Sequence, residues 1–187
     1  MSSLAPERPR RTALLRRWPT VLALAPVVAT LGGGADGQVA PLAQVLVLLS
    51  LLYLVVAKLR RREASWPVLA ALLILYVVLL ALDVVPPAAV FAGVALAVLV
   101  WGAVDGDLRR SPALRAQAFG VIGFGALALA GLLVAPGLGR YLVAAGWFLH
   151  GVWDFVHLRK DAVVSRSYAE WCGVVDILIA TQLVFLL

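Results

Sequence analysis

Residues 41–57 read PLAQVLVLLSLLYLVVA, a stretch without a single charged side chain. A helix of this length rises about 25 Å at about 1.5 Å per residue, which approaches the roughly 30 Å hydrocarbon core of a bilayer. The whole chain of 187 residues has the same character, since 63% of it is hydrophobic and 14% is charged. Soluble domains are about 45–50% apolar and about 25% charged. The sequence therefore predicts an integral membrane protein.

Gly, Pro and charged residues divide the chain into seven apolar segments. The segments are residues 18–31, 41–57, 66–82, 87–104, 116–134, 138–158 and 168–187. We expect each to form a transmembrane helix, so the predicted fold is an all-α bundle that forms one domain over residues 18–187. A basic cytoplasmic tail, residues 1–17, precedes it. The first segment is short and contains Pro26, and if it belongs to a cleaved signal peptide the bundle has six helices.

The Lys and Arg residues predict the orientation of the bundle. Fifteen of the sixteen lie in the tail or in the loops after the second, fourth and sixth segments, and only Arg140 lies elsewhere. Because cytoplasmic loops are rich in Lys and Arg, we expect a cytoplasmic N-terminus and an outer C-terminus, in a bacterial-type cell membrane. The net charge of +6 forms no continuous basic face, so no nucleic-acid partner is expected. The single cysteine, Cys172, excludes an internal disulfide and a CxxC motif.

The sixth segment contains HGVWDFVH, residues 150–157, where polar residues interrupt an apolar helix. At about 100° per residue, Trp147, His150, Asp154 and His157 fall within an arc of about 80°. The opposite side of this helix is apolar. Because ionisable side chains are costly in lipid, we expect the polar face to point into the bundle and to mark a functional site.

The seventh segment supplies a second set of residues at matching depth. It runs antiparallel to the sixth, and at about 1.5 Å per residue Asp176 reaches about 12 Å from the cytoplasmic end, close to the level of His150. Cys172 shares a helix face with Asp176, and we interpret it as a small apolar filler. We therefore expect His150, Asp154, His157 and Asp176 to meet in the cytoplasmic half of the bundle.

The last two segments resemble the C-terminal signature of small, uncharacterised prokaryotic integral-membrane proteins. That signature reads W-x-x-H-x-x-W-D-x-x-H, followed by a Cys and, four residues later, an Asp. The matching positions are Trp147, His150, Trp153, Asp154, His157, Cys172 and Asp176. This chain has Leu158 where the relatives carry a further His, which argues against a His-rich metal site. The resemblance implies a shared site and brings no known activity.

The favoured function is a small membrane enzyme that performs acid–base chemistry on a lipid or isoprenoid substrate, as in terpene cyclisation by protonation. An Asp held in apolar surroundings can act as an acid, with a His as the partner base. The expected catalytic residues are His150, Asp154, Asp176 and His157. The expected substrate-binding residues are Trp147, Trp153, Tyr53 and Tyr76. No cofactor or metal is required by this hypothesis.

Three alternatives stay open at this stage. Metal-assisted lipid hydrolysis would use His150, Asp154, His157 and Asp176 as ligands, although His150 and His157 are separated by about 10.5 Å along the helix axis. A proton-coupled transporter or channel would use the cluster as a relay. A non-catalytic membrane scaffold would use it to fix the register of two helices. Each is compatible with a homo-oligomer.

Overall fold

The computed structural model describes residues 18–31 and 35–186, and every regular element among them is helical. The helices are α2 (Trp18–Leu22), α3 (Leu24–Thr30), α4 (Ala35–Leu59), α5 (Ser65–Leu82), α6 (Pro87–Val104), α7 (Asp107–Arg110), α8 (Pro112–Leu133), α9 (Pro136–Lys160) and α10 (Arg166–Phe185), with a 3₁₀ turn at Arg62–Ala64. The all-α prediction is confirmed. The predicted tail, residues 1–17, lies outside the described residues.

Five of these helices are long and apolar enough to cross a membrane, judged by length and composition. They are α4, α5, α6, α8 and α10. The 25-residue α9 has sufficient length, but its apolar run is interrupted by His150 and Asp154. The first predicted segment forms a shorter apolar helix pair over Trp18–Thr30. The helices suggest a membrane-embedded protein, whereas the count of seven and the orientation stay predictions.

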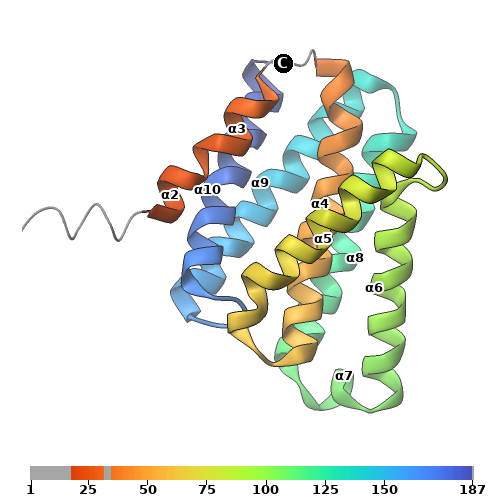
Figure 1. Cartoon of the computed structure of the whole chain (residues 1–187), viewed down its shortest axis with the longest axis vertical. Coiled ribbons are helices and arrows are strands. Elements are labelled where there is room, and N and C mark those ends of the chain that lie inside the picture. Colours follow the sequence, from red (N-terminus) through yellow and green to blue (C-terminus); the bar gives the residue numbers. More distant parts are fainter. Residues whose placement is uncertain (1–17, 32–34, 187) are drawn as a thin grey trace, which may run out of the picture.

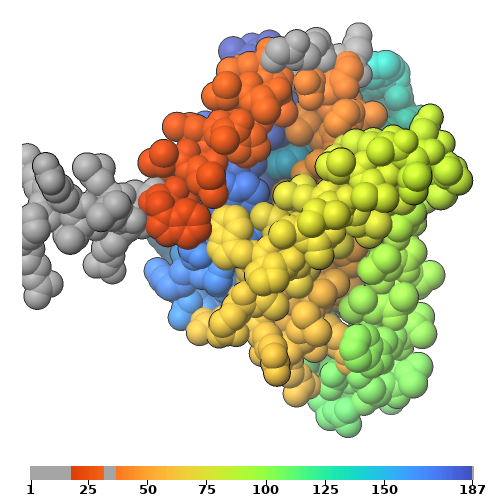
Figure 2. Space-filling view, in the orientation of Figure 1, coloured from red at the N-terminus to blue at the C-terminus, as the bar shows by residue number. Residues whose placement is uncertain are grey.

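The centre of the bundle is α4, which contacts α5, α6, α8 and α9. Its apolar residues surround the whole helix, and 72% of its span is buried, against 22% for α5. A helix that is apolar on all sides is stable only inside such a bundle or in lipid. In Figure 1, α5 crosses α4 obliquely and α6 lies at one edge. Figure 2 shows that α5 is spread over the face of the molecule seen there.

The two N-terminal helices lie along α10. Thr20 donates a hydrogen bond to Glu170 (2.7 Å), and Thr30 donates one to Gln182 (2.9 Å). These contacts advance in the same direction along both segments, so the α2–α3 pair runs parallel to α10, as Figure 1 shows. Ala23, whose backbone keeps helical dihedral angles, separates α2 from α3.

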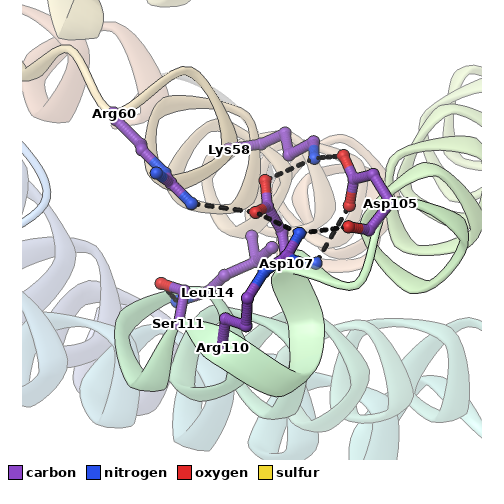
Figure 3. A network of polar contacts seen from close by, with 7 residues as sticks. All are labelled: Lys58, Arg60, Asp105, Asp107, Arg110, Ser111 and Leu114. Carbon is purple, nitrogen blue, oxygen red and sulfur yellow. Dashed lines mark hydrogen bonds and ion pairs between the residues drawn. The ribbon is translucent and has the colours of Figure 1, made fainter.

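At one end of the bundle, an ionic network joins α4 to the turn between α6 and α8. The Lys58 side chain is only 4% exposed and donates hydrogen bonds to Asp105 and to Asp107, the latter at 2.8 Å. Arg60 also binds Asp107 at 2.8 Å, and the Lys58 ammonium lies 4.6 Å from the centre of the Trp101 ring. Figure 3 shows that Lys58 lies between the two carboxylates. This network fixes the end of α4 against the neighbouring loop.

Candidate functional site

Four polar side chains meet between α9 and α10. His150 and Asp154 come from α9, Cys172 and Asp176 come from α10, and all four are fully buried. The Nδ1 atom of His150 lies 2.6 Å from Oδ2 of Asp176 and 3.5 Å from Oδ2 of Asp154. One potential ligand atom from each of the four residues lies within 4.8 Å of the others. We call this group the α9–α10 cluster.

The local sequence explains why the cluster forms. Each helix contributes a pair of residues spaced by four, His150 with Asp154 and Cys172 with Asp176, and such pairs share one helix face. The expected meeting of His150, Asp154 and Asp176 is therefore observed as geometry. Their catalytic roles stay a prediction.

Two glycines allow the helices to approach at the level of the cluster. A Cβ atom on Gly151 of α9 would lie 3.1 Å from Cβ of Asp176, and one on Gly173 of α10 would lie 3.2 Å from Cβ of Asp154. Each glycine thus faces an acidic residue of the opposite helix. Small residues at such positions allow close packing of membrane helices. Here they bring the polar side chains within hydrogen-bonding range.

The central helix α4 is the third helix that contacts the cluster, through the side chain of Tyr53. Its hydroxyl donates a hydrogen bond to Oδ1 of Asp154, and its ring packs against the imidazole of His150 with centroids 5.6 Å apart. Tyr53 was expected to bind substrate, and its bond to Asp154 was not predicted. The ring of Phe124, from α8, also packs against the imidazole of His150, with centroids 4.9 Å apart.

Tyr168 and Cys172 extend the cluster along α10. The Cys172 thiol lies 3.5 Å from the Tyr168 hydroxyl and 3.8 Å from Oδ1 of Asp176. Tyr168 was not singled out from the sequence. It is the third residue of α10, and an aromatic residue near the end of an apolar helix is typical of a membrane interface. The structure instead buries it completely beside Cys172.

His157 belongs to a separate polar network. Its Nδ1 atom lies 2.8 Å from the carbonyl oxygen of Trp153, and its Nε2 atom lies 2.9 Å from Nε2 of Gln117. Trp153 donates its indole N–H to Oε1 of Gln117 at 3.2 Å. The described contacts give His157 no hydrogen bond to the two carboxylates, and the ring of Tyr53 lies beside it at 5.1 Å. His157 was expected to meet the two carboxylates, but it lies outside the α9–α10 cluster.

The remaining predicted substrate-binding residues lie in different surroundings. Trp147 is buried and donates its indole N–H to the carbonyl oxygen of Leu42 at 3.1 Å, which ties α9 to α4. Tyr76 of α5 is half-buried, and its ring packs against Phe91 of α6 at 6.3 Å. The structure thus places Tyr76 at a different helix contact.

Two buried atoms of the cluster have no hydrogen-bond partner among the described residues, namely Nε2 of His150 and Oδ2 of Asp154. Buried polar atoms without partners are rare in folded proteins, and each costs about 1–3 kcal/mol. The cluster also holds two carboxyl groups and one imidazole away from water. Such a set is stable in an apolar interior only if a proton or a cation compensates the excess negative charge.

The residue types allow two kinds of chemistry. An imidazole with one nitrogen held by a carboxylate can exchange a proton through its other nitrogen. Alternatively, one His nitrogen, one Cys sulfur and two carboxylate oxygens form a set of four ligands of the kinds that bind zinc. The group that could hold a metal contains Cys172 in place of the predicted His157.

Comparisons with protein-family models, with curated proteins and with solved structures give no match for this chain. The resemblance to small prokaryotic membrane proteins therefore stays a prediction.

Proposed function

We propose that the protein is an integral membrane enzyme that performs acid–base chemistry on a lipid or isoprenoid substrate at the α9–α10 cluster. The observation that supports this most directly is that two buried polar atoms, Nε2 of His150 and Oδ2 of Asp154, make no described hydrogen bond. His150 has Nδ1 engaged with Asp176 and Nε2 free of any described partner. A group so placed is oriented by one atom and reactive at the other.

The proposed proton path uses the two nitrogens of His150 differently. The carboxylate of Asp176 accepts the Nδ1–H hydrogen bond at 2.6 Å, which keeps the proton on Nδ1 and leaves a lone pair on Nε2. This is the arrangement by which a carboxylate orients a catalytic histidine. In the proposed reaction Nε2 of His150 removes a proton from the substrate.

Asp154 is the proposed acid. Its Oδ1 atom accepts a hydrogen bond from Tyr53, while Oδ2 makes no described hydrogen bond and lies 3.5 Å from Nδ1 of His150. Protonation of an alkene or epoxide by Asp154 forms a carbocation, and loss of a proton to His150 then restores a double bond. Once the product has left, a water molecule can carry the Nε2 proton of His150 to Oδ2 of Asp154, which restores both groups. The rings of Tyr53 and Phe124, which both pack against His150, would stabilise the cation between these steps.

A scaffold role is the main competing explanation, because the cluster is fully buried and packed. A network that only fixes helix register gains most when all its polar atoms are paired. The unpaired atoms of His150 and Asp154 favour a reactive role instead. Because the cluster is closed, the proposal requires α8 or α4 to move away from α9 when substrate enters.

The test compares membrane lipids from cells that express the wild-type chain or single variants. We expect His150→Ala and Asp154→Asn to abolish a change in lipid or isoprenoid composition that the wild type produces, while the purified variants stay folded in detergent. Asp83→Asn, at a helix end, is the matched control and should behave as the wild type. Loss of folding together with the lipid change would support a scaffold. Proton flux in liposomes without any lipid change would support transport.

Metal-assisted hydrolysis is a second candidate, supported by the four ligand atoms within 4.8 Å of one another. It differs from the acid–base proposal in its need for Cys172. If a metal is bound, the purified protein contains about one transition metal ion per chain, and Cys172→Ala removes it together with the activity. Under the acid–base proposal the same variant retains activity and the metal content is negligible in both proteins.

A further inference from the structure

A long apolar groove lies between α6 and α8, at a site separate from the α9–α10 cluster. Both helices pack on α4 but scarcely touch each other. A cavity of about 310 Å³ lies over Val47 of α4, and a second of about 400 Å³ continues it toward the α6–α7 turn. The two share Leu99 of α6 and Ile122 of α8, so they form one continuous groove.

The groove changes from apolar to cationic along its length. A third cavity of about 360 Å³ follows the second one and shares with it Ala103, Leu108 and Arg115. Arg109 also lines this third cavity. The rest of the groove is lined almost wholly by Ala, Val, Leu and Ile side chains. One end thus suits an anion and the remainder suits a hydrocarbon chain.

The two arginines at this end are not neutralised by the nearby acids. Asp105 and Asp107 are engaged by Lys58, and Asp107 also by Arg60. Arg115 donates to the carbonyl oxygen of Arg109 at 2.7 Å, a neutral acceptor. The Arg109 side chain has no hydrogen-bond or ion-pair partner within the described part of the chain. Positive charge is therefore available at the end of the groove.

The length of the groove matches a lipid chain. From Arg115 to Leu129 along α8 the rise is about 21 Å at about 1.5 Å per residue. One leaflet of the hydrocarbon core is about 15 Å thick, half of the roughly 30 Å core. An acyl chain that starts at the arginines can therefore follow the groove through its whole leaflet.

We propose that this groove binds one anionic phospholipid, with the phosphate between Arg109 and Arg115 and an acyl chain between α6 and α8. Guanidinium groups bind phosphate oxygens through charge-assisted, often bidentate hydrogen bonds. The predicted orientation places both arginines on the cytoplasmic side, where anionic headgroups attract basic residues. The proposal does not depend on the chemistry of the α9–α10 cluster.

The first experiment measures lipid binding to delipidated protein in detergent by native mass spectrometry and thermal unfolding. We expect phosphatidylglycerol to bind and raise the unfolding temperature, with at least tenfold weaker binding by the double variant Arg109→Gln/Arg115→Gln. The double variant Arg159→Gln/Lys160→Gln removes the same charge from the end of α9 and should bind as the wild type. Equal binding of phosphatidylglycerol by both double variants, or equal binding of phosphatidylcholine by the wild type, would overturn the proposal.

The second experiment fills the groove without removing charge. A Cβ atom on Gly125, which lines the groove, meets nothing within 4 Å, and the same is true of Gly123, which lies outside it. Both are in α8, so each substitution by Leu has the same effect on helix propensity. We expect Gly125→Leu to weaken phosphatidylglycerol binding and Gly123→Leu to leave it unchanged. If Gly125→Leu instead disrupts a stable dimer and leaves lipid binding intact, a second copy of the chain occupies the groove and the lipid proposal fails.

Discussion

Nδ1 of His150 lies 2.6 Å from Oδ2 of Asp176, across the contact between two helices and in an interior where both side chains are fully buried. Buried partners of this kind depend on each other, because removal of one leaves the other polar group unsatisfied. The pair therefore contributes to stability whatever its chemical role.

We predict that this dependence appears as coupling in a double-mutant cycle. His150→Ala and Asp176→Ala should each destabilise the protein by about 1–3 kcal/mol, because each leaves a buried partner unpaired. The double variant should be less destabilised than the sum, with a coupling free energy of at least about 0.5 kcal/mol. Denaturant unfolding in detergent, followed by helical circular dichroism, measures all four proteins. Simple additivity would mean that the two groups do not interact in the folded protein.

The Tyr53 hydroxyl gives a second prediction. Tyr53→Phe keeps the ring against His150 and removes the only described hydrogen bond to Oδ1 of Asp154. We expect a loss of about 1–3 kcal/mol in unfolding free energy, the cost of a buried carboxyl atom without a partner. Tyr76→Phe is the control, because the Tyr76 hydroxyl makes no described hydrogen bond and its side chain is half-exposed. Equal effects of the two substitutions would contradict the role assigned to Tyr53.

The helical class and the main features of the cluster could be predicted from the sequence. Runs of apolar residues, bounded by Gly, Pro and charged residues, predicted the helices. The matching depth of residues on two antiparallel segments, each with a pair of residues spaced by four, predicted that Asp176 lies beside His150. These predictions succeeded because they use only distances along a helix and connections between neighbours in the chain. Both are set by local geometry.

What the sequence did not reveal depends on how helices rotate against one another. Because α4 is apolar on every side, no stripe indicates which face meets α9, so the bond between Tyr53 and Asp154 could not be predicted. His157 lies on the predicted polar face, yet Gln117 of α8 takes its Nε2 atom. An apolar helix carries no signal for this choice, since the partner is selected by packing across the bundle.

Gly139 offers a test of the contact between α8 and α9. A Cβ atom there would lie 2.3 Å from the carbonyl oxygen of Gly131, a backbone atom that cannot turn aside. We expect Gly139→Ala to cost about 1–3 kcal/mol, the usual range for overpacking, or more. Gly137→Ala, two residues earlier in the same helix, meets nothing within 4 Å and should change stability little. Thermal unfolding in detergent compares them, and similar midpoints would show that the two helices are not in close contact at Gly139.

The last prediction concerns the effect of low pH on the stability that the ionic network around Lys58 provides. The hydrogen bonds from Lys58 are the main reason that the pKa of the Asp105 carboxyl and that of Asp107 lie below the ordinary value of 3.8. A carboxyl whose pKa is lowered by folding binds fewer protons in the folded state than in the unfolded state. Its stabilising effect is therefore complete above the ordinary pKa and is lost as the pH falls through the lowered one.

Replacing Lys58 by Met removes the donor and leaves both carboxylates in place. We expect the variant to be less stable than the wild type at pH 7, and the difference in unfolding free energy to shrink as the pH falls from about 5 toward 2, because protonated carboxyls no longer attract the ammonium. Lys160→Met at the end of α9, a Lys with no described ion pair, should show no such convergence. Denaturant unfolding at a series of pH values measures this. If the gap between wild type and Lys58→Met stays constant down to pH 2, the network in Figure 3 does not hold α4 to the α6–α7 turn through charge.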